Sequence, residues 1–110
     1  MYTSMYLVHY DPRFVSIAGK CPDYYKGREY KILAPKYWFF KHYKDTGDKE
    51  FYIREYNKLL SKLDPEKVVR DLGMDSILMC WEPPGKFCHR RLVAEWLENS
   101  LGIVVPELEM

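Results

Sequence analysis

Residues 76–91 have the sequence SILMCWEPPGKFCHRR, and this stretch decides the fold of the chain. Residues 77–81 form a short apolar run typical of a buried strand, and a helical pattern begins near Cys88. A strand that leads through a turn into a helix is typical of α/β proteins, which bind ligands where strands end. The stretch therefore predicts an α/β fold and a site at the turn.

The rest of the chain alternates between strand and helix patterns. Asp48 is a favourable N-cap, and Asp64-Pro65 combines a cap with a proline in the first turn, so each is expected to begin a helix. We predict a small single-domain protein, residues 1–110, with a Rossmann-like sheet flanked by helices. The expected strands are 2–8, 14–17, 77–81 and 103–105; the expected helices are 35–45, with a buried aromatic face, 48–63, 64–72 and 88–100.

Composition restricts the class of protein. The chain has 110 residues, of which 47% are hydrophobic and 16% aromatic, enough for a folded core. No apolar run approaches the roughly 20 residues that cross a bilayer, and residues 1–6 lack the pattern of a secretion signal, so we expect a cytoplasmic protein without a membrane partner. The three cysteines are an odd number, and we expect them to be free thiols.

The charge pattern leaves a nucleic-acid partner open. The net charge is only +1, but the first half is basic and rich in tyrosine. Bases could stack on these rings while lysines contact phosphates, which would make the protein a non-catalytic nucleic-acid-binding module. The alternative is that the rings belong to the core and the lysines are solvated. The basic residues concerned are Lys20, Lys26, Arg28, Lys31, Lys36, Lys41 and Lys44.

The turn before the last helix has the features of an anion site. The first N–H groups of a helix lack partners and carry a partial positive charge. Lys86, Arg90 and Arg91 would reinforce that charge, so we predict that they bind a ligand. Arg90 and Arg91 point in different directions on a helix, so one of them could instead be solvated or pair with Glu95.

Four residues of the same stretch are candidates for catalysis. Glu82 follows a buried strand and precedes two prolines, Pro83 and Pro84, so we expect its position to be rigid. It could act as a general base or bind ribose hydroxyls. A thiol near a helix N-terminus has a lowered pKa, so Cys80 or Cys88 could act as a nucleophile. His89 could relay a proton. Alternatively, Glu82 is a solvated loop acid and His89 is a neutral imidazole that only forms hydrogen bonds. Cys80 and Cys88 would then be ordinary packed residues.

No cofactor and no metal is expected from the sequence. Cys80, Cys88 and His89 could in principle hold zinc. However, the adjacent Cys88 and His89 match no familiar structural-zinc spacing, and the sequence offers no evident fourth ligand.

Three blocks of the sequence resemble the DUF488 family, a domain of unknown function. They lie within residues 25–35, 63–68 and 78–97, and the last block is the most specific: an apolar strand that ends in Cys-x-Glu, followed by Cys-His-Arg on a helix. The resemblance spans nearly the whole chain. It implies an intracellular α/β protein in which Cys80, Glu82, Cys88, His89 and Arg90 matter, and it implies no substrate.

The leading hypothesis is a small enzyme or enzyme-like domain that binds a phosphate-bearing ligand, a nucleotide or a nucleic acid, at the strand-to-helix turn. A second hypothesis is the non-catalytic nucleic-acid-binding module. A third is that Cys-x-Glu and Cys-His-Arg form a hydrogen-bonded network needed only for folding.

Overall fold

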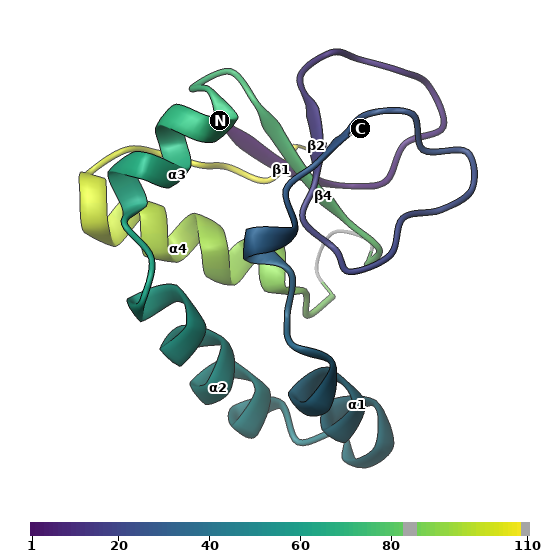
Figure 1. Cartoon of the computed structure of the whole chain (residues 1–110), viewed down its shortest axis with the longest axis vertical. Helices are drawn as coiled ribbons and strands as arrows, with labels where there is room; N and C mark the ends of the chain where they lie inside the picture. The colour runs from purple at the N-terminus through teal and green to yellow at the C-terminus, as the bar shows by residue number, and fades with distance from the viewer. Residues whose placement is uncertain (83–85, 109–110) are drawn as a thin grey trace.

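The computed structural model describes residues 1–82 and 86–108 and contains a four-stranded parallel sheet beside four α-helices (Figure 1). The strand order is β1-β4-β2-β3, so β4 lies in the middle between β1 and β2. The α/β, Rossmann-like prediction is confirmed. The strands are β1 (Tyr2–Met5), β2 (Phe14–Ser16), β3 (Arg28–Glu29) and β4 (Ile77–Cys80).

α2 (Lys49–Ser61) and α3 (Pro65–Leu72) begin where their caps indicate. The side chain of Asp48 accepts a hydrogen bond from the Phe51 N–H group, and that of Asp64 accepts one from the Glu66 N–H group. Gly47 and Gly102 end α1 and α4 with φ of 72° and 68°, a left-handed conformation that glycine adopts without steric cost. The helices are α1 (Tyr37–Thr46), α2 (Lys49–Ser61), α3 (Pro65–Leu72) and α4 (His89–Leu101).

The two faces of the sheet are covered differently. Val15 and Leu78 belong to the core shared with the helices, in which α4 packs on β1 and β4 while α2 and α3 pack on α4. Ile77 and Met79 alternate with Leu78 and belong to a second cluster, with Tyr6, Phe14 and Ala18. Helices therefore lie on one face of the sheet, and loops cover the other (Figure 1). The helices that flank the sheet thus lie on one of its faces.

Three local expectations were wrong. Residues 103–105 are not a strand; the chain there makes a single parallel bridge between Thr3 and Glu107. Residues 18–33, in which no strand or helix was expected, contain β3 and a 3-10 helix, η1 (Lys31–Leu33). In α1 only Phe39 is buried, whereas Tyr37 and Trp38 are 73% and 58% exposed, because α1 packs mainly against α2 and lies at the edge of the molecule (Figure 1).

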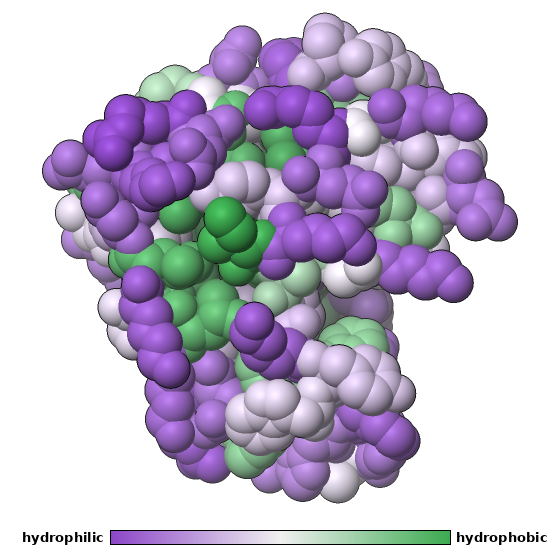
Figure 2. Space-filling model, viewed as in Figure 1, coloured by the Kyte–Doolittle hydropathy of each residue, from purple (hydrophilic) through white to green (hydrophobic). Residues whose placement is uncertain are grey.

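The outer surface is mixed. Hydrophilic side chains cover most of the face in Figure 2, with a hydrophobic patch near its middle. In the part of the chain that the structure describes, none of the helices combines the length and the apolar character that crossing a membrane requires.

Candidate functional site

A cavity of about 440 Å³ opens at the carboxyl end of the sheet. Residues that follow β2 (Ala18, Gly19 and Lys20) form one side, and residues that follow β4 form another. α1, Tyr52 of α2 and the start of α4 also line it. The molecular outline in Figure 2 is indented between the upper right loops and the lower part of the molecule. The carboxyl ends of adjacent parallel strands are where open α/β sheets bind ligands.

The walls of the cavity are mainly aromatic. Trp81 is held in place because its indole N–H group donates a 2.8 Å hydrogen bond to the Lys20 carbonyl oxygen, which links the ends of β4 and β2. Its ring also makes an edge contact with Tyr6. The sequence assigned the α1 rings to the core, but α1 contributes three of them to the cavity. The aromatic lining residues are Tyr37, Phe40, Tyr43, Tyr52, Trp81 and Phe87.

Charged side chains also line the cavity. Glu82 lies there, and its carboxylate is 3.9 Å from the Lys44 ammonium group; the two side chains are 39% and 52% exposed. Lys20 is the second lysine among the described lining residues. Pro83 and Pro84, which were expected to hold Glu82, lie outside the described residues.

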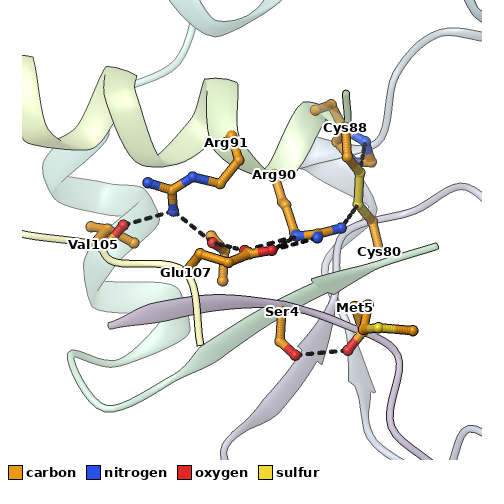
Figure 3. A network of polar contacts seen from close by, with 10 residues as sticks. Ser4, Met5, Cys80, Cys88, Arg90, Arg91, Val105 and Glu107 are labelled. Carbon is orange, nitrogen blue, oxygen red and sulfur yellow. Dashed lines mark hydrogen bonds and ion pairs between the residues drawn. A yellow bond between two sulfur atoms is a disulfide. The ribbon is translucent and has the colours of Figure 1, made fainter. Parts of the chain in front are cut away.

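The sulfur atoms of Cys80 and Cys88 meet in the structure as a disulfide (Figure 3). Cys80 ends β4, and Cys88 is the N-cap of α4, so the pair links strand and helix across the turn. The expectation of three free thiols is therefore wrong for these two residues, and Cys21 is the free cysteine. Both paired side chains line the cavity although they are almost entirely buried.

His89 is buried beside the cysteine pair and has a defined tautomer. Its Nε2 atom lies 2.7 Å from the carbonyl oxygen of Ile17, which can only accept a hydrogen bond, so Nε2 carries the proton. In the neutral ring Nδ1 therefore has a free lone pair, and it lies 3.7 Å from the Cys88 sulfur. Burial lowers the pKa of His89 to about 4, and the charge of Arg90 acts in the same direction.

These three residues form a set of possible metal ligands. One ligand atom from each of Cys80, Cys88 and His89 lies within 4.8 Å of the others. The sequence spacing of Cys88 and His89 therefore does not prevent the three from converging.

Arg90 and Arg91 are engaged in the interior network of Figure 3. Arg90 is 1% exposed; it donates hydrogen bonds to both carboxylate oxygens of Glu107 and, at 3.1 Å, to the Cys80 sulfur. Arg91 donates to the Thr3 hydroxyl and to the Val105 carbonyl oxygen. Partial burial acts to raise the pKa of Glu107, but the hydrogen bonds from Arg90 and Thr3 outweigh it and lower the pKa.

The structure thus places only some of the residues expected at the site in the cavity. Cys80, Glu82, Cys88 and His89 line one cavity. The donors of Arg90 and Arg91 are used in the interior, and Lys86 is exposed outside the described lining.

Sequence reasoning missed several contributors to the site. It singled out neither Glu107 nor the backbone carbonyl of Ile17, since no sequence signal identifies either. Lys20 and Lys44 were part of the basic pattern of the first half, but that pattern could not separate them from the other lysines.

The family model DUF488-N3a, described as the active DUF488-N3 subclade, matches residues 3–101. Comparison with curated proteins and with solved structures finds no significant match.

The Arg90–Glu107 pair should carry a large part of the stability. Glu107→Ala leaves the buried guanidinium without its counter-ion and should lower the free energy of unfolding by about 3–5 kcal/mol in urea titrations. Arg90→Met should cost less, because it removes the buried charge and Glu107 retains access to water. Glu95→Ala, an exposed position on the same helix, is the control and should change stability by about 0.5 kcal/mol or less. Equal, small effects of Glu107→Ala and Glu95→Ala would contradict this assignment.

His89 should make the fold sensitive to acid. Its pKa is about 4 in the folded protein and 6.5 as the ordinary value, so the unfolded chain binds more protons between these values. Stability is therefore complete above pH 6.5 and falls as the pH decreases toward 4, by about 2 kcal/mol between pH 6.5 and 4.5. Urea unfolding at a series of pH values, with EDTA present, measures the slope. His89→Gln should be less stable at pH 7 and flatter over this range; an unchanged slope would assign the effect to other groups.

Proposed function

The chain belongs to the DUF488 family, and from that premise we propose that its cavity binds a phosphate-bearing, nucleotide-like ligand on which Glu82 acts as an acid or base. One observation carries the proposal: a cavity of about 440 Å³ with aromatic walls also contains two lysines, a carboxylate and the Cys80–Cys88–His89 cluster. A volume of this size is within the usual range of small-molecule sites.

The aromatic walls favour a ligand with a planar ring. Tyr37, Phe40 and Tyr43 come from one helix, and Trp81 lines the same cavity from the segment after β4. Aromatic side chains offer stacking and edge contacts to a nucleobase, worth about 1–3 kcal/mol per base. The hydrogen bond from Trp81 to Lys20 fixes that ring before the ligand arrives, which lowers the entropy cost of binding.

Lys20 and Lys44 supply the charge for a phosphate group. Both are exposed residues that line the cavity, so their ammonium groups can reach a bound anion without crossing the interior. They take the role that the sequence assigned to Arg90 and Arg91, whose donors already bind Glu107, Thr3 and Val105. The Lys44 ammonium group lies 3.9 Å from the Glu82 carboxylate, so a phosphate bound by Lys44 would lie close to Glu82.

Glu82 is the best placed acid or base of the cavity. Its carboxylate is partly exposed, lies near Lys44 and lines the cavity, so it can reach a bound ligand. His89, buried and neutral, is suited to hydrogen bonding rather than to carrying charge. The description of the matching subclade as active is in accord with an enzyme.

A nucleic acid is the second candidate ligand, and the exposure of α1 favours it. Tyr37 and Trp38 are 73% and 58% exposed, and Lys36 and Lys41 lie on the same segment. Such a surface can stack unpaired bases and contact phosphates without the cavity. Binding would then depend strongly on salt concentration and would involve Lys41 as well as Lys44.

Lys44→Ala should weaken nucleotide binding about tenfold, since a hydrogen bond to a charged group is worth roughly 1.5 kcal/mol when it is partly solvated. Isothermal titration with the four nucleoside monophosphates measures it. Lys41→Ala is the matched control, because Lys41 is on the same helix, pairs with Asp45 and is not among the described lining residues. Equal losses in both variants, with binding confined to oligonucleotides, would favour the nucleic-acid surface; absence of binding by mononucleotides and oligonucleotides would contradict both.

Glu82→Gln should separate binding from chemistry. The substitution keeps the shape of the side chain and removes its capacity to accept a proton, so turnover should fall at least about a hundredfold while Kd stays nearly constant. Chromatography of the nucleotide identified by titration, after incubation with protein, measures the turnover. Glu95→Gln is the surface control. A fully active Glu82→Gln protein would exclude the acid–base role.

A further inference from the structure

Two sulfurs and one imidazole nitrogen converge at the inner wall of the cavity. The candidate ligand atoms of Cys80, Cys88 and His89 lie within 4.8 Å of one another. We propose that, in the dithiol form, Cys80, Cys88 and His89 bind a thiophilic divalent cation such as Zn²⁺, with a fourth coordination position open to the cavity. This inference goes beyond the proposed function and does not depend on a nucleotide.

The hydrogen bonding of His89 prepares it as a ligand. Metal-binding histidines commonly donate their second ring N–H group to a carbonyl or carboxylate, which fixes the tautomer. Here Nε2 faces the Ile17 carbonyl oxygen at 2.7 Å, and this leaves Nδ1 unprotonated next to the Cys88 sulfur. The ring is 6% exposed and its edge-on contact with Tyr56 restricts rotation. The free lone pair is therefore held toward the two sulfurs.

The backbone positions of the two cysteines suit a shared cation. Their Cα atoms are 7.2 Å apart, whereas disulfides usually span about 4.4–6.8 Å. Zn–S bonds of about 2.3 Å in tetrahedral geometry place two sulfurs about 3.8 Å apart, so a cation between them accommodates a wider backbone separation than a disulfide does. The strand end and the helix N-cap that carry them are both anchored, one in β4 and the other on α4.

The charges of the surroundings also fit. Two thiolates would neutralise a divalent cation, and the Arg90 guanidinium beside them is neutralised by Glu107. Arg90 donates a hydrogen bond to the Cys80 sulfur at 3.1 Å, which stabilises the anionic form of that sulfur. The whole assembly can therefore be buried without net charge, which avoids the cost of isolated ions in the interior.

The open position accounts for the missing fourth ligand. Structural zinc sites have four protein ligands, whereas catalytic sites have three and bind water or substrate at the fourth position. All three proposed ligands line the cavity of about 440 Å³, so a water molecule or a ligand group can complete the coordination. Glu82 lines the same cavity, where it could exchange a proton with such a water molecule.

Binding requires the reduced pair. A phosphine reductant opens the disulfide with one water molecule: the phosphine is oxidised to its oxide, and Cys80 and Cys88 gain two electrons and two protons. Each thiol then releases its proton when its sulfur binds the cation.

The test is titration of the full-length chain, reduced with a phosphine, with Co²⁺, whose tetrahedral thiolate complexes absorb intensely in visible light. We expect one equivalent to bind and Zn²⁺ to displace it. Cys21→Ser, the control, should keep the spectrum, whereas Cys80→Ser or Cys88→Ser should weaken binding more than about a hundredfold. Reduced wild-type protein without a thiolate–cobalt spectrum, or a spectrum lost in Cys21→Ser instead, would overturn the proposal.

A second measurement needs no variant and covers the case in which the serine variants do not fold. Reduced wild-type protein is treated with an alkylating reagent, with and without Zn²⁺, and peptide mass spectrometry follows each cysteine. We expect Zn²⁺ to slow alkylation of Cys80 and Cys88 at least about tenfold and to leave Cys21 unchanged. Equal rates with and without Zn²⁺ at all three cysteines would refute the site. Since no nucleotide is present, failure here is distinct from failure of the nucleotide proposal.

Discussion

The buried ion pair between Arg90 and Glu107 is the interaction on which the rest of the site depends. The guanidinium is 1% exposed and bonds to both oxygens of Glu107 and to the Cys80 sulfur, so it connects α4, the end of β4 and the segment after α4 (Figure 3). A buried guanidinium without partners would be severely destabilising, and Glu107 supplies the counter-charge. The bridge between Thr3 and Glu107 holds the segment that contains Glu107 against β1. The network thus fixes the position of Cys80 at the end of β4 relative to the start of α4. Because His89 is the first residue of α4, its position is fixed as well. Arg90 is therefore part of a buried hydrogen-bonded network, whereas Cys80, Glu82, Cys88 and His89 line the cavity.

The unequal cover of the sheet explains where the cavity forms. α4 and the helices behind it occupy one face, and side chains from loops, such as Tyr6 and Ala18, cover the other. The segment that follows β2 therefore crosses the carboxyl edge beside the end of β4, where Trp81 bonds to the Lys20 carbonyl group. α1 packs mainly on α2 at the edge of the molecule, and three of its rings, those of Tyr37, Phe40 and Tyr43, line the cavity. An exposed aromatic helix, unexpected for a core element, is what makes the cavity aromatic.

The parts of this arrangement that could be predicted are those with local signals. Asp48 and Asp64 predict helix starts because their side chains can accept hydrogen bonds from the N–H groups of the first turn. Residues 77–80 predict a buried strand because all of them are apolar. The cavity could be placed at the turn after β4 because strand and helix patterns are local as well. The partner of Arg90 could not be predicted, since Glu107 lies 17 residues away in a segment without regular structure. The burial of Tyr37 and Trp38 was mispredicted for a related reason: helical spacing shows that a face is aromatic, but only the packing of α1 decides whether that face is covered.

The inner wall of the cavity combines features that a purely structural cluster does not require. Packing alone would be satisfied by two small apolar residues in place of Cys80 and Cys88. Instead one sulfur accepts a hydrogen bond from a guanidinium, and the other faces an imidazole nitrogen whose lone pair is left free by the Ile17 carbonyl. In the dithiol form, the first contact would favour a negative sulfur, and the second would offer a neutral donor atom beside it. Burial keeps that imidazole neutral, because the charged ring would lose its hydration next to Arg90. In the dithiol form, the group would present two sulfurs and a neutral imidazole nitrogen to a cavity that also contains a carboxylate and two lysines.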